Sequence, residues 1–122
     1  MNALVSIITP SYNSAKFIAE TIQSVQSQTY SNWEMIIVDD GSSDETENVV
    51  LSIIQNDNRI QFHKLSQNSG PAVARNTGIE KASGDYMTFI DADDIWFSTF
   101  IENNIKTIQE TEIPFVFSSY KR

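Results

Sequence analysis

Short apolar runs alternate with segments of helical periodicity along almost the whole chain, and this alternation strongly limits the possible folds. The apolar runs have the length of buried strands, and the segments between them repeat apolar residues every three or four positions. Strands are predicted at 4–9, 33–39, 60–65, 86–90 and 115–118, with helices beginning near 17, 42, 71 and 99. This pattern predicts an α/β, Rossmann-like architecture in which a mostly parallel sheet carries helices on both faces.

Local signals place the helix ends. Ser42 and Glu45 have the spacing of a capping box, which predicts a helix start at that point. Pro71, directly after Gly70, suits the first turn of the third helix. Gly84 follows the same segment and is predicted to cap its end. We expect the first four strands to lie in the spatial order 3-2-1-4, with the fifth strand outside this count.

Length and composition restrict the class of protein. With 122 residues, the chain is expected to form a single domain over 1–122. It contains no cysteine, so disulfides and thiolate metal sites are excluded, and a reducing, cytoplasmic compartment is favoured. No apolar run approaches the roughly 18 residues of a membrane span. The formal net charge of −8 disfavours nucleic acid as a partner, and a phosphorylated ligand would need a cation to mask the charge.

Polar residues gather where three of the predicted strands end. Ligands of open parallel sheets bind beyond the carboxyl ends of the strands. The first strand is followed by Tyr12, the second by Asp39 and Asp40, and the fourth by Asp91 and Asp93. In the order 3-2-1-4 these three strands are neighbours, so we expect one shared crevice.

The two carboxylates of Asp91 and Asp93 are separated by one residue at a strand end. Such a pair can turn toward one hard cation, and oxygen ligands suit Mg²⁺ or Mn²⁺. A cation at this place can bridge a diphosphate and stabilise it as a leaving group. The alternative is that Asp93 and Asp94 only precede and cap the following helix.

Three further side chains have both a binding and a structural interpretation. Asp40 can accept a hydrogen bond from a base N–H, or belong to a simple turn. Tyr12 can stack on a base, or be an ordinary turn aromatic. Arg75 can pair with a phosphate or a carboxylate of the site, or form a surface ion pair. Neither a P-loop nor a dinucleotide fingerprint is present.

Four motifs in series, TPSYN, VDDGSSD, NSGPAVARNTGI and GDYMTFIDADD, closely resemble those of family 2 glycosyltransferases of the GT-A fold. The resemblance covers the chain from about Leu4. It implies an enzyme that transfers a sugar from a nucleotide-diphosphate sugar, with UDP as the default nucleotide, to a saccharide or lipid-linked acceptor. Inversion at the sugar and a setting in cell-surface polysaccharide synthesis are also implied.

The resemblance also implies roles for individual residues. Asp91 and Asp93 match the D-x-D motif that holds Mn²⁺ or Mg²⁺ on the diphosphate. Asp40 matches the carboxylate that reads the base. The other residues implied for the nucleotide-sugar site are Pro10, Tyr12, Asp39 and Arg75.

In that family, the general base and the acceptor-binding half come later than the motifs present here. We therefore expect the 122 residues to form the donor-binding part of a truncated GT-A fold, inactive alone, with the catalytic residue unknown. Any contact with the membrane periphery would come from parts outside this chain. A non-catalytic nucleotide-sugar-binding module is the alternative. A nucleotidylyltransferase ranks third, because the segment after the first strand lacks a Gly- and Arg-rich loop.

Overall fold

The computed structural model describes residues 2–111 and 117–118. A five-stranded parallel sheet runs through it in the order β3-β2-β1-β4-β5. The order predicted for the first four strands is confirmed, and β5 continues the sheet beside β4. Residues 115 and 116 of the predicted fifth strand lie outside the described residues. The strands are β1 (Val5–Ser11), β2 (Trp33–Asp39), β3 (Ile60–Lys64), β4 (Tyr86–Phe89) and β5 (Phe117–Ser118).

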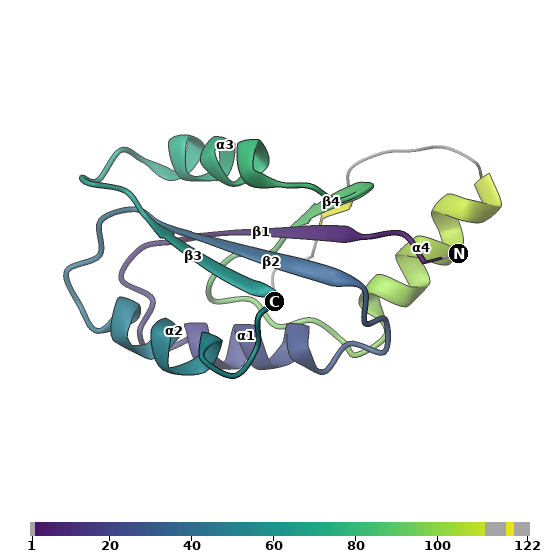
Figure 1. Ribbon diagram of the computed structural model, residues 1–122, viewed down its shortest axis with the longest axis horizontal. Coiled ribbons are helices and arrows are strands. Elements are labelled where there is room, and N and C mark those ends of the chain that lie inside the picture. Colours follow the sequence, from purple (N-terminus) through teal and green to yellow (C-terminus); the bar gives the residue numbers. More distant parts are fainter. Residues whose placement is uncertain (1, 112–116, 119–122) are drawn as a thin grey trace.

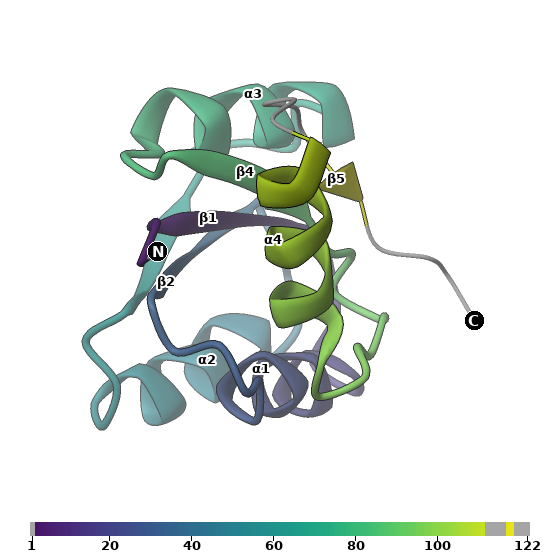
Figure 2. The ribbon, with the colours of Figure 1, turned by 90° about the vertical axis from the view of Figure 1, so that its right-hand side faces the viewer.

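Helices cover both faces of the sheet, as the alternation predicts. In Figure 1, α3 lies above the sheet and α1 and α2 lie below it. Figure 2 shows α4 at the end of the sheet, between the levels of α1 and β4. The helices are α1 (Ile18–Gln26), α2 (Thr46–Ile54), α3 (Pro71–Lys81) and α4 (Phe100–Thr111).

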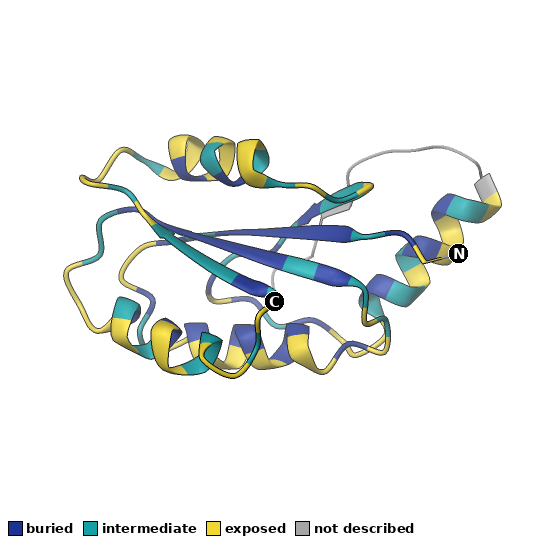
Figure 3. Cartoon of the chain, viewed as in Figure 1, coloured by how far each residue is buried: buried dark blue, intermediate teal, exposed yellow. Residues whose placement is uncertain are grey.

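The central strands are buried on both sides, which explains why they are continuously apolar in sequence (Figure 3). One face of β1 contributes Val5 and Ile7 to the main core, together with residues of α1, α2 and α4. On the opposite face of β1, the space between the sheet and α3 is small. A Cβ added at Gly78 of α3 would lie only 2.6 Å from Cγ2 of the fully buried Ile8. Glycine at this position therefore lets α3 pack directly on β1.

The capping box predicted at Ser42 and Glu45 is wrong. Helix α2 begins at Thr46, and Glu45 at the N-cap position makes no side-chain capping bond. Instead, Oδ1 of Asp44 accepts the Thr46 N–H at 2.9 Å, while the Ser42 hydroxyl donates to Oδ1 of Asp39 at 2.5 Å. The preceding loop uses Ser42 for its own contacts, so the helix starts later.

The predicted cap at Gly84 is also wrong. Helix α3 ends at Lys81, and the extended Ala82 takes the C-cap position with its N–H bonded to the Ile79 carbonyl. A Cβ at Gly84 would lie 2.6 Å from the Ser6 hydroxyl and 2.8 Å from the Leu4 carbonyl. Close approach to β1, and not helix termination, explains this glycine.

Among the described residues, no helix is both long and apolar enough to cross a membrane.

Candidate functional site

A cleft of about 590 Å³ opens beyond the carboxyl ends of β1, β2 and β4. This is the place that the strand-end rule predicts, because these three strands are adjacent in the sheet. The cleft brings together most of the predicted nucleotide-sugar residues, although they come from four separate segments. Those that line it are Pro10, Tyr12, Asp40, Arg75, Asp91 and Asp93. Asp39 does not line it.

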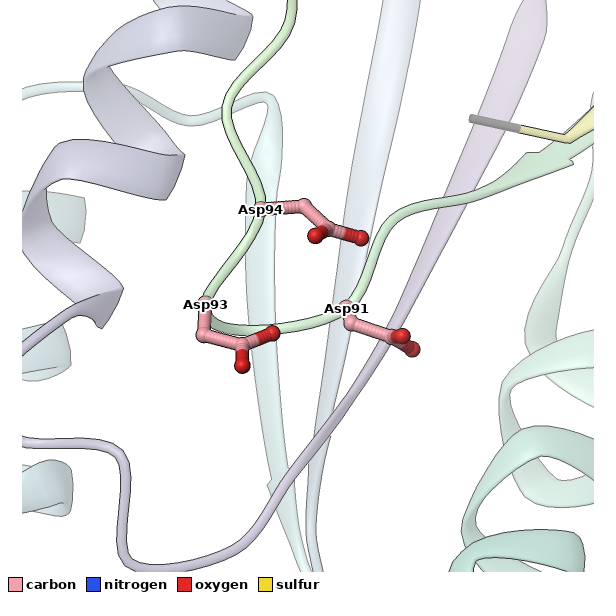
Figure 4. Close-up of side chains that lie close together, drawn as sticks. All are labelled: Asp91, Asp93 and Asp94. Atoms are coloured by element: carbon pink, nitrogen blue, oxygen red, sulfur yellow. The ribbon is translucent and has the colours of Figure 1, made fainter. Parts of the chain in front are cut away.

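The turn after β4 carries three carboxylates that lie close together. Oxygen atoms of Asp91, Asp93 and Asp94 all fall within 4.8 Å of one another. Figure 4 shows the three side chains close together on this turn. Asp93 is exposed, Asp91 is half-buried and Asp94 is buried. Clustered carboxylate oxygens are the donors preferred by Mg²⁺ and Mn²⁺, so the donor set fits the implied cation, with Asp94 as a third candidate ligand.

A buried polar stripe on α1 holds this acidic turn in place. The stripe consists of Thr21 and Ser24 in the helix and Gln28 just beyond it. The Thr21 hydroxyl lies 2.9 Å from the carbonyl oxygen of Ala92 and 2.7 Å from that of Asp94. One buried side chain of α1 therefore fixes the backbone on both sides of Asp93.

The rest of the stripe anchors the chain as it continues toward α4. The Ser24 hydroxyl accepts the Trp96 N–H at 3.3 Å. The Gln28 amide donates to the Phe97 carbonyl at 2.6 Å and accepts the Ile101 N–H at 3.0 Å. The segment from the acidic turn to the start of α4 thus depends on α1 for its conformation.

Asp40 is buried and is fixed by backbone groups at the start of α3. Its Oδ1 accepts the Ser69 N–H at 2.6 Å, and its Oδ2 accepts the Gly70 N–H at 2.9 Å. The Asp40 N–H donates to the Ser11 carbonyl at 2.8 Å. A carboxylate has about four lone-pair sites, so each oxygen keeps capacity for a ligand donor. Asp40 is therefore held rigidly at the edge of the cleft.

Two exposed aromatic rings, Tyr12 and Phe17, line the same cleft. Tyr12 is 49% exposed and Phe17 is 52% exposed, which is unusual for rings of this size in a small domain. The first helix was predicted to begin at Phe17, with Ile18, Ile22 and Val25 on its apolar face. In the structure α1 begins at Ile18, and Phe17 precedes it with its ring at the cleft.

Arg75 supplies a positive charge on the α3 side of the cleft. Its guanidinium carbon lies 5.9 Å from the centroid of the Phe89 ring, in cation–π range. Within the part of the chain that the structure describes, Arg75 takes part in no ion pair. The surface ion pair considered for Arg75 is therefore absent from that part, and its charge remains available toward the cleft.

A comparison with family models decides the classification. Residues 6–121 match the model described as glycosyl transferase family 2. The chain belongs to glycosyl transferase family 2. The family named from the four motifs is thus confirmed over nearly the entire sequence.

Family 2 relatives and solved structures agree with this membership. The chain is 42% identical over 118 residues to WfgD of Escherichia coli, named UDP-Glc:alpha-D-GlcNAc-diphosphoundecaprenol beta-1,3-glucosyltransferase, covering 97% of this chain and 46% of that one. The crystal structure of S. aureus TarS 1-349 in complex with UDP aligns with a TM-score of 0.83 and 32% identity, covering 88% of this chain and 32% of that TarS chain.

A further solved structure is that of a mannosyltransferase. PcManGT from Pyrobaculum calidifontis, in complex with GDP-Man and Mn²⁺, has a TM-score of 0.83 and 26% identity, covering 88% of this chain and 33% of that one. The fold is thus the GT-A type expected from the resemblance. The chain spans 46% of the length of WfgD and of TuaG of Bacillus subtilis, and 17% of the length of a glycosyltransferase of Rickettsia bellii.

Sequence reasoning missed some residues that line the cleft of this family 2 chain. Ser11 is only 3% exposed, and its hydroxyl has no hydrogen-bond partner among the described residues. Asn13 and Asn68 also line the cleft. The strand-end rule carried a signal for Ser11 and Asn13, because both follow the apolar part of β1. Asn68 is the first residue of the motif NSGPAVARNTGI, and the loop between β3 and α3 brings it to the site.

Proposed function

We propose that the cleft binds a nucleotide-diphosphate sugar, with a UDP-sugar as the default donor. The protein to which this chain belongs then transfers the sugar, with inversion, to a saccharide or lipid-linked acceptor. The proposal includes dependence on Mn²⁺ or Mg²⁺ and a role in cell-surface polysaccharide synthesis. We place the reaction in the cytoplasm, at the inner face of the membrane.

The observation that carries the proposal is the convergence of complementary groups on one cleft. Tyr12 offers a flat ring, and Asp40 offers a fixed acceptor for a base N–H. On the far side, Asp91 and Asp93 offer carboxylate oxygens, and Arg75 offers a positive charge for phosphate. A ligand with a base at one end and a diphosphate at the other uses all of these groups.

The relatives support the chemical class of the ligand. TarS was crystallised with UDP and with UDP-GlcNAc, and PcManGT with GDP-Man and Mn²⁺. WfgD is named for a UDP-Glc donor and a diphosphoundecaprenol acceptor. UDP is therefore the first nucleotide to test, with GDP as the comparison.

A division of labour among the residues follows. Asp40 and Tyr12 orient the base, and Arg75 approaches the phosphates with its guanidinium group. Asp91 and Asp93, with Asp94 behind them, would hold the cation. When bound, that cation neutralises the diphosphate and stabilises it as a leaving group. Since the whole chain carries −8, the bare carboxylates would otherwise repel the phosphates.

A thermal-shift experiment tests the proposal. We expect UDP with Mn²⁺ to raise the melting temperature and UDP with a chelator to change it little. A ligand at 100 times its Kd stabilises a fold by about 2.7 kcal/mol, which melting detects easily. Asp91→Ala and Asp93→Ala should each remove the Mn²⁺-dependent part of the shift.

Glu80→Ala is the matched control, because it removes one negative charge from the exposed surface of α3 outside the cleft. This variant should keep the full shift. Equal stabilisation in chelator and in Mn²⁺ would contradict the metal role. Absence of any shift with UDP, GDP and their sugar conjugates would contradict donor binding itself.

A further inference from the structure

The loops after β1 and β2 are joined by a chain of hydrogen bonds that begins at Asp39. Asp39 is fully buried, and both of its carboxylate oxygens accept from Ser42, at 2.5 Å from the hydroxyl and 2.8 Å from the N–H. The Ser42 hydroxyl in turn accepts the Asn13 N–H at 2.8 Å. A buried carboxylate thereby fixes the peptide group directly after Tyr12.

A second set of contacts holds the same loop from the other side. The Asn13 side-chain oxygen accepts the N–H groups of Ser43 at 2.9 Å and Asp44 at 3.3 Å. Oδ2 of Asp44 accepts the Ala15 N–H at 3.2 Å. Asn13 has a φ of 49°, a left-handed conformation that asparagine tolerates and most other residues avoid. The two loops are interlocked around Asn13.

We infer that Asp39 is a positioning residue that acts through Ser42 and Asn13 to present the Tyr12 ring to the base of a bound nucleotide. This inference rests on the proposed function. It replaces the expectation that Asp39 itself contacts the nucleotide sugar. Asp39 cannot touch a ligand in the cleft, since it is fully buried and the cleft is lined by other residues.

The physical reason lies in the exposure of Tyr12. A ring that is 49% exposed receives little orientation from packing, so its direction depends on its own backbone. Fixing that backbone before the ligand arrives reduces the ordering cost of binding. The Asp39–Ser42–Asn13 chain supplies this constraint from a buried, permanently ordered anchor.

The test compares Ser42→Ala with Ser42→Thr, which keeps the hydroxyl. Ser52→Ala, on the exposed side of α2, is the matched control for loss of a hydroxyl. We expect Ser42→Ala to weaken UDP binding in Mn²⁺ about tenfold, the loss given by about one hydrogen bond. Ser42→Thr should bind within about twofold of the unsubstituted chain. Inorganic pyrophosphate with Mn²⁺, which has no base, should bind all variants equally.

A double-mutant cycle with Tyr12→Ala separates positioning from general destabilisation. In the Tyr12→Ala background, Ser42→Ala should cost no further UDP affinity. Asn13→Gly, which permits the left-handed backbone, provides a second break in the chain and should also weaken UDP selectively. The inference would be overturned if Ser42→Ala and Asn13→Gly both left the UDP affinity unchanged. It would also be overturned if Ser42→Ala weakened UDP binding as much in the Tyr12→Ala background as in the unsubstituted chain. Failure of the unsubstituted chain to bind any nucleotide diphosphate would instead overturn the proposed function and the inference with it.

Discussion

Tyr12 shows how much one side chain can contribute at the residue scale. Its ring is half-exposed and lines the cleft. We predict that Tyr12→Ala weakens UDP binding by about 1–3 kcal/mol, the usual value of base–aromatic stacking. Tyr12→Phe keeps the ring and should bind nearly normally. Calorimetric titration with UDP in Mn²⁺ measures both.

Phe97→Ala is the control for loss of an exposed aromatic. Phe97 is 86% exposed and does not line the cleft, so its removal should leave UDP affinity unchanged. A Tyr12→Ala variant that binds UDP as tightly as the unsubstituted chain would show that the ring does not stack on the base.

Individual site residues were predictable where strand position alone decides their place. Asp40, Asp91 and Asp93 follow strands at the expected edge and do line the cleft. Asp39, which was also predicted for the site, does not line the cleft, because side chains alternate along a strand. As the last residue of β2, it points inward with Ile37, and only the next residue turns to the cleft. Assigning alternate residues of the strand to opposite faces of the sheet would have separated Asp39 from Asp40.

The packing of α3 on β1 is the clearest feature at the element scale. Gly78→Ala should destabilise the fold, because the new Cβ would stand 2.6 Å from a fully buried side chain, Ile8, in a central strand. Alanine would gain up to about 1 kcal/mol of helix propensity. Overpacking costs about 1–3 kcal/mol, so a net loss is expected.

Urea unfolding of Gly78→Ala and of Asn76→Ala measures this difference. Asn76 lies on the exposed side of the same helix, and its replacement should change stability by no more than about 0.5 kcal/mol. A Gly78→Ala variant as stable as the unsubstituted chain would mean that α3 can move away from β1 at little cost.

The elements themselves followed from hydrophobic periodicity, whereas their ends did not. The apolar positions of α1, at Ile18, Ile22 and Val25, are all buried as predicted. The start of α2 was misplaced because the Ser42 hydroxyl can either cap the helix or bond to a residue of the preceding loop. Its bond to Asp39 depends on the folded loop, which no local spacing encodes.

Acidification should destabilise the molecule as a whole, and Asp57 offers a defined contribution. The Arg59 side chain donates to Asp57 at 3.0 Å, and its guanidinium also lies 3.8 Å from the Trp33 ring. The hydrogen bond from Arg59 lowers the pKa of Asp57, against the opposing effect of burial. The resulting stability is full above the unfolded-state pKa of about 3.9 and is lost as pH falls through the lower folded-state pKa.

Asp57→Asn should therefore lower the stability at pH 7 by about 1 kcal/mol, a melting shift of about 4 °C. The difference from the unsubstituted chain should shrink as the pH falls below about 4. Glu110→Gln, on the exposed surface of α4, is the control for loss of a surface carboxylate and should change the stability at pH 7 by no more than about 0.5 kcal/mol. A melting difference for Asp57→Asn that stays constant from pH 7 to pH 3 would contradict this account.

At the scale of the whole molecule, the sheet order was predictable because alternating strands and helices allow few right-handed arrangements. The cleft followed from that order. Most contacts that support the cleft were not predictable, since they join residues far apart in the sequence, as from Ser14 to Thr46 or from Thr21 to Ala92.

The buried polar stripe of α1 has a practical consequence for protein engineering. The backbone of the acidic turn and of the segment after it is held by Thr21, Ser24 and Gln28. A graft of residues 91–98 into another scaffold would lose these anchors and leave buried carbonyl and N–H groups uncompensated. The smallest unit that can be exchanged is therefore the turn together with α1 and Gln28, which supply its anchors. Chimaeras should keep these two segments from the same parent protein.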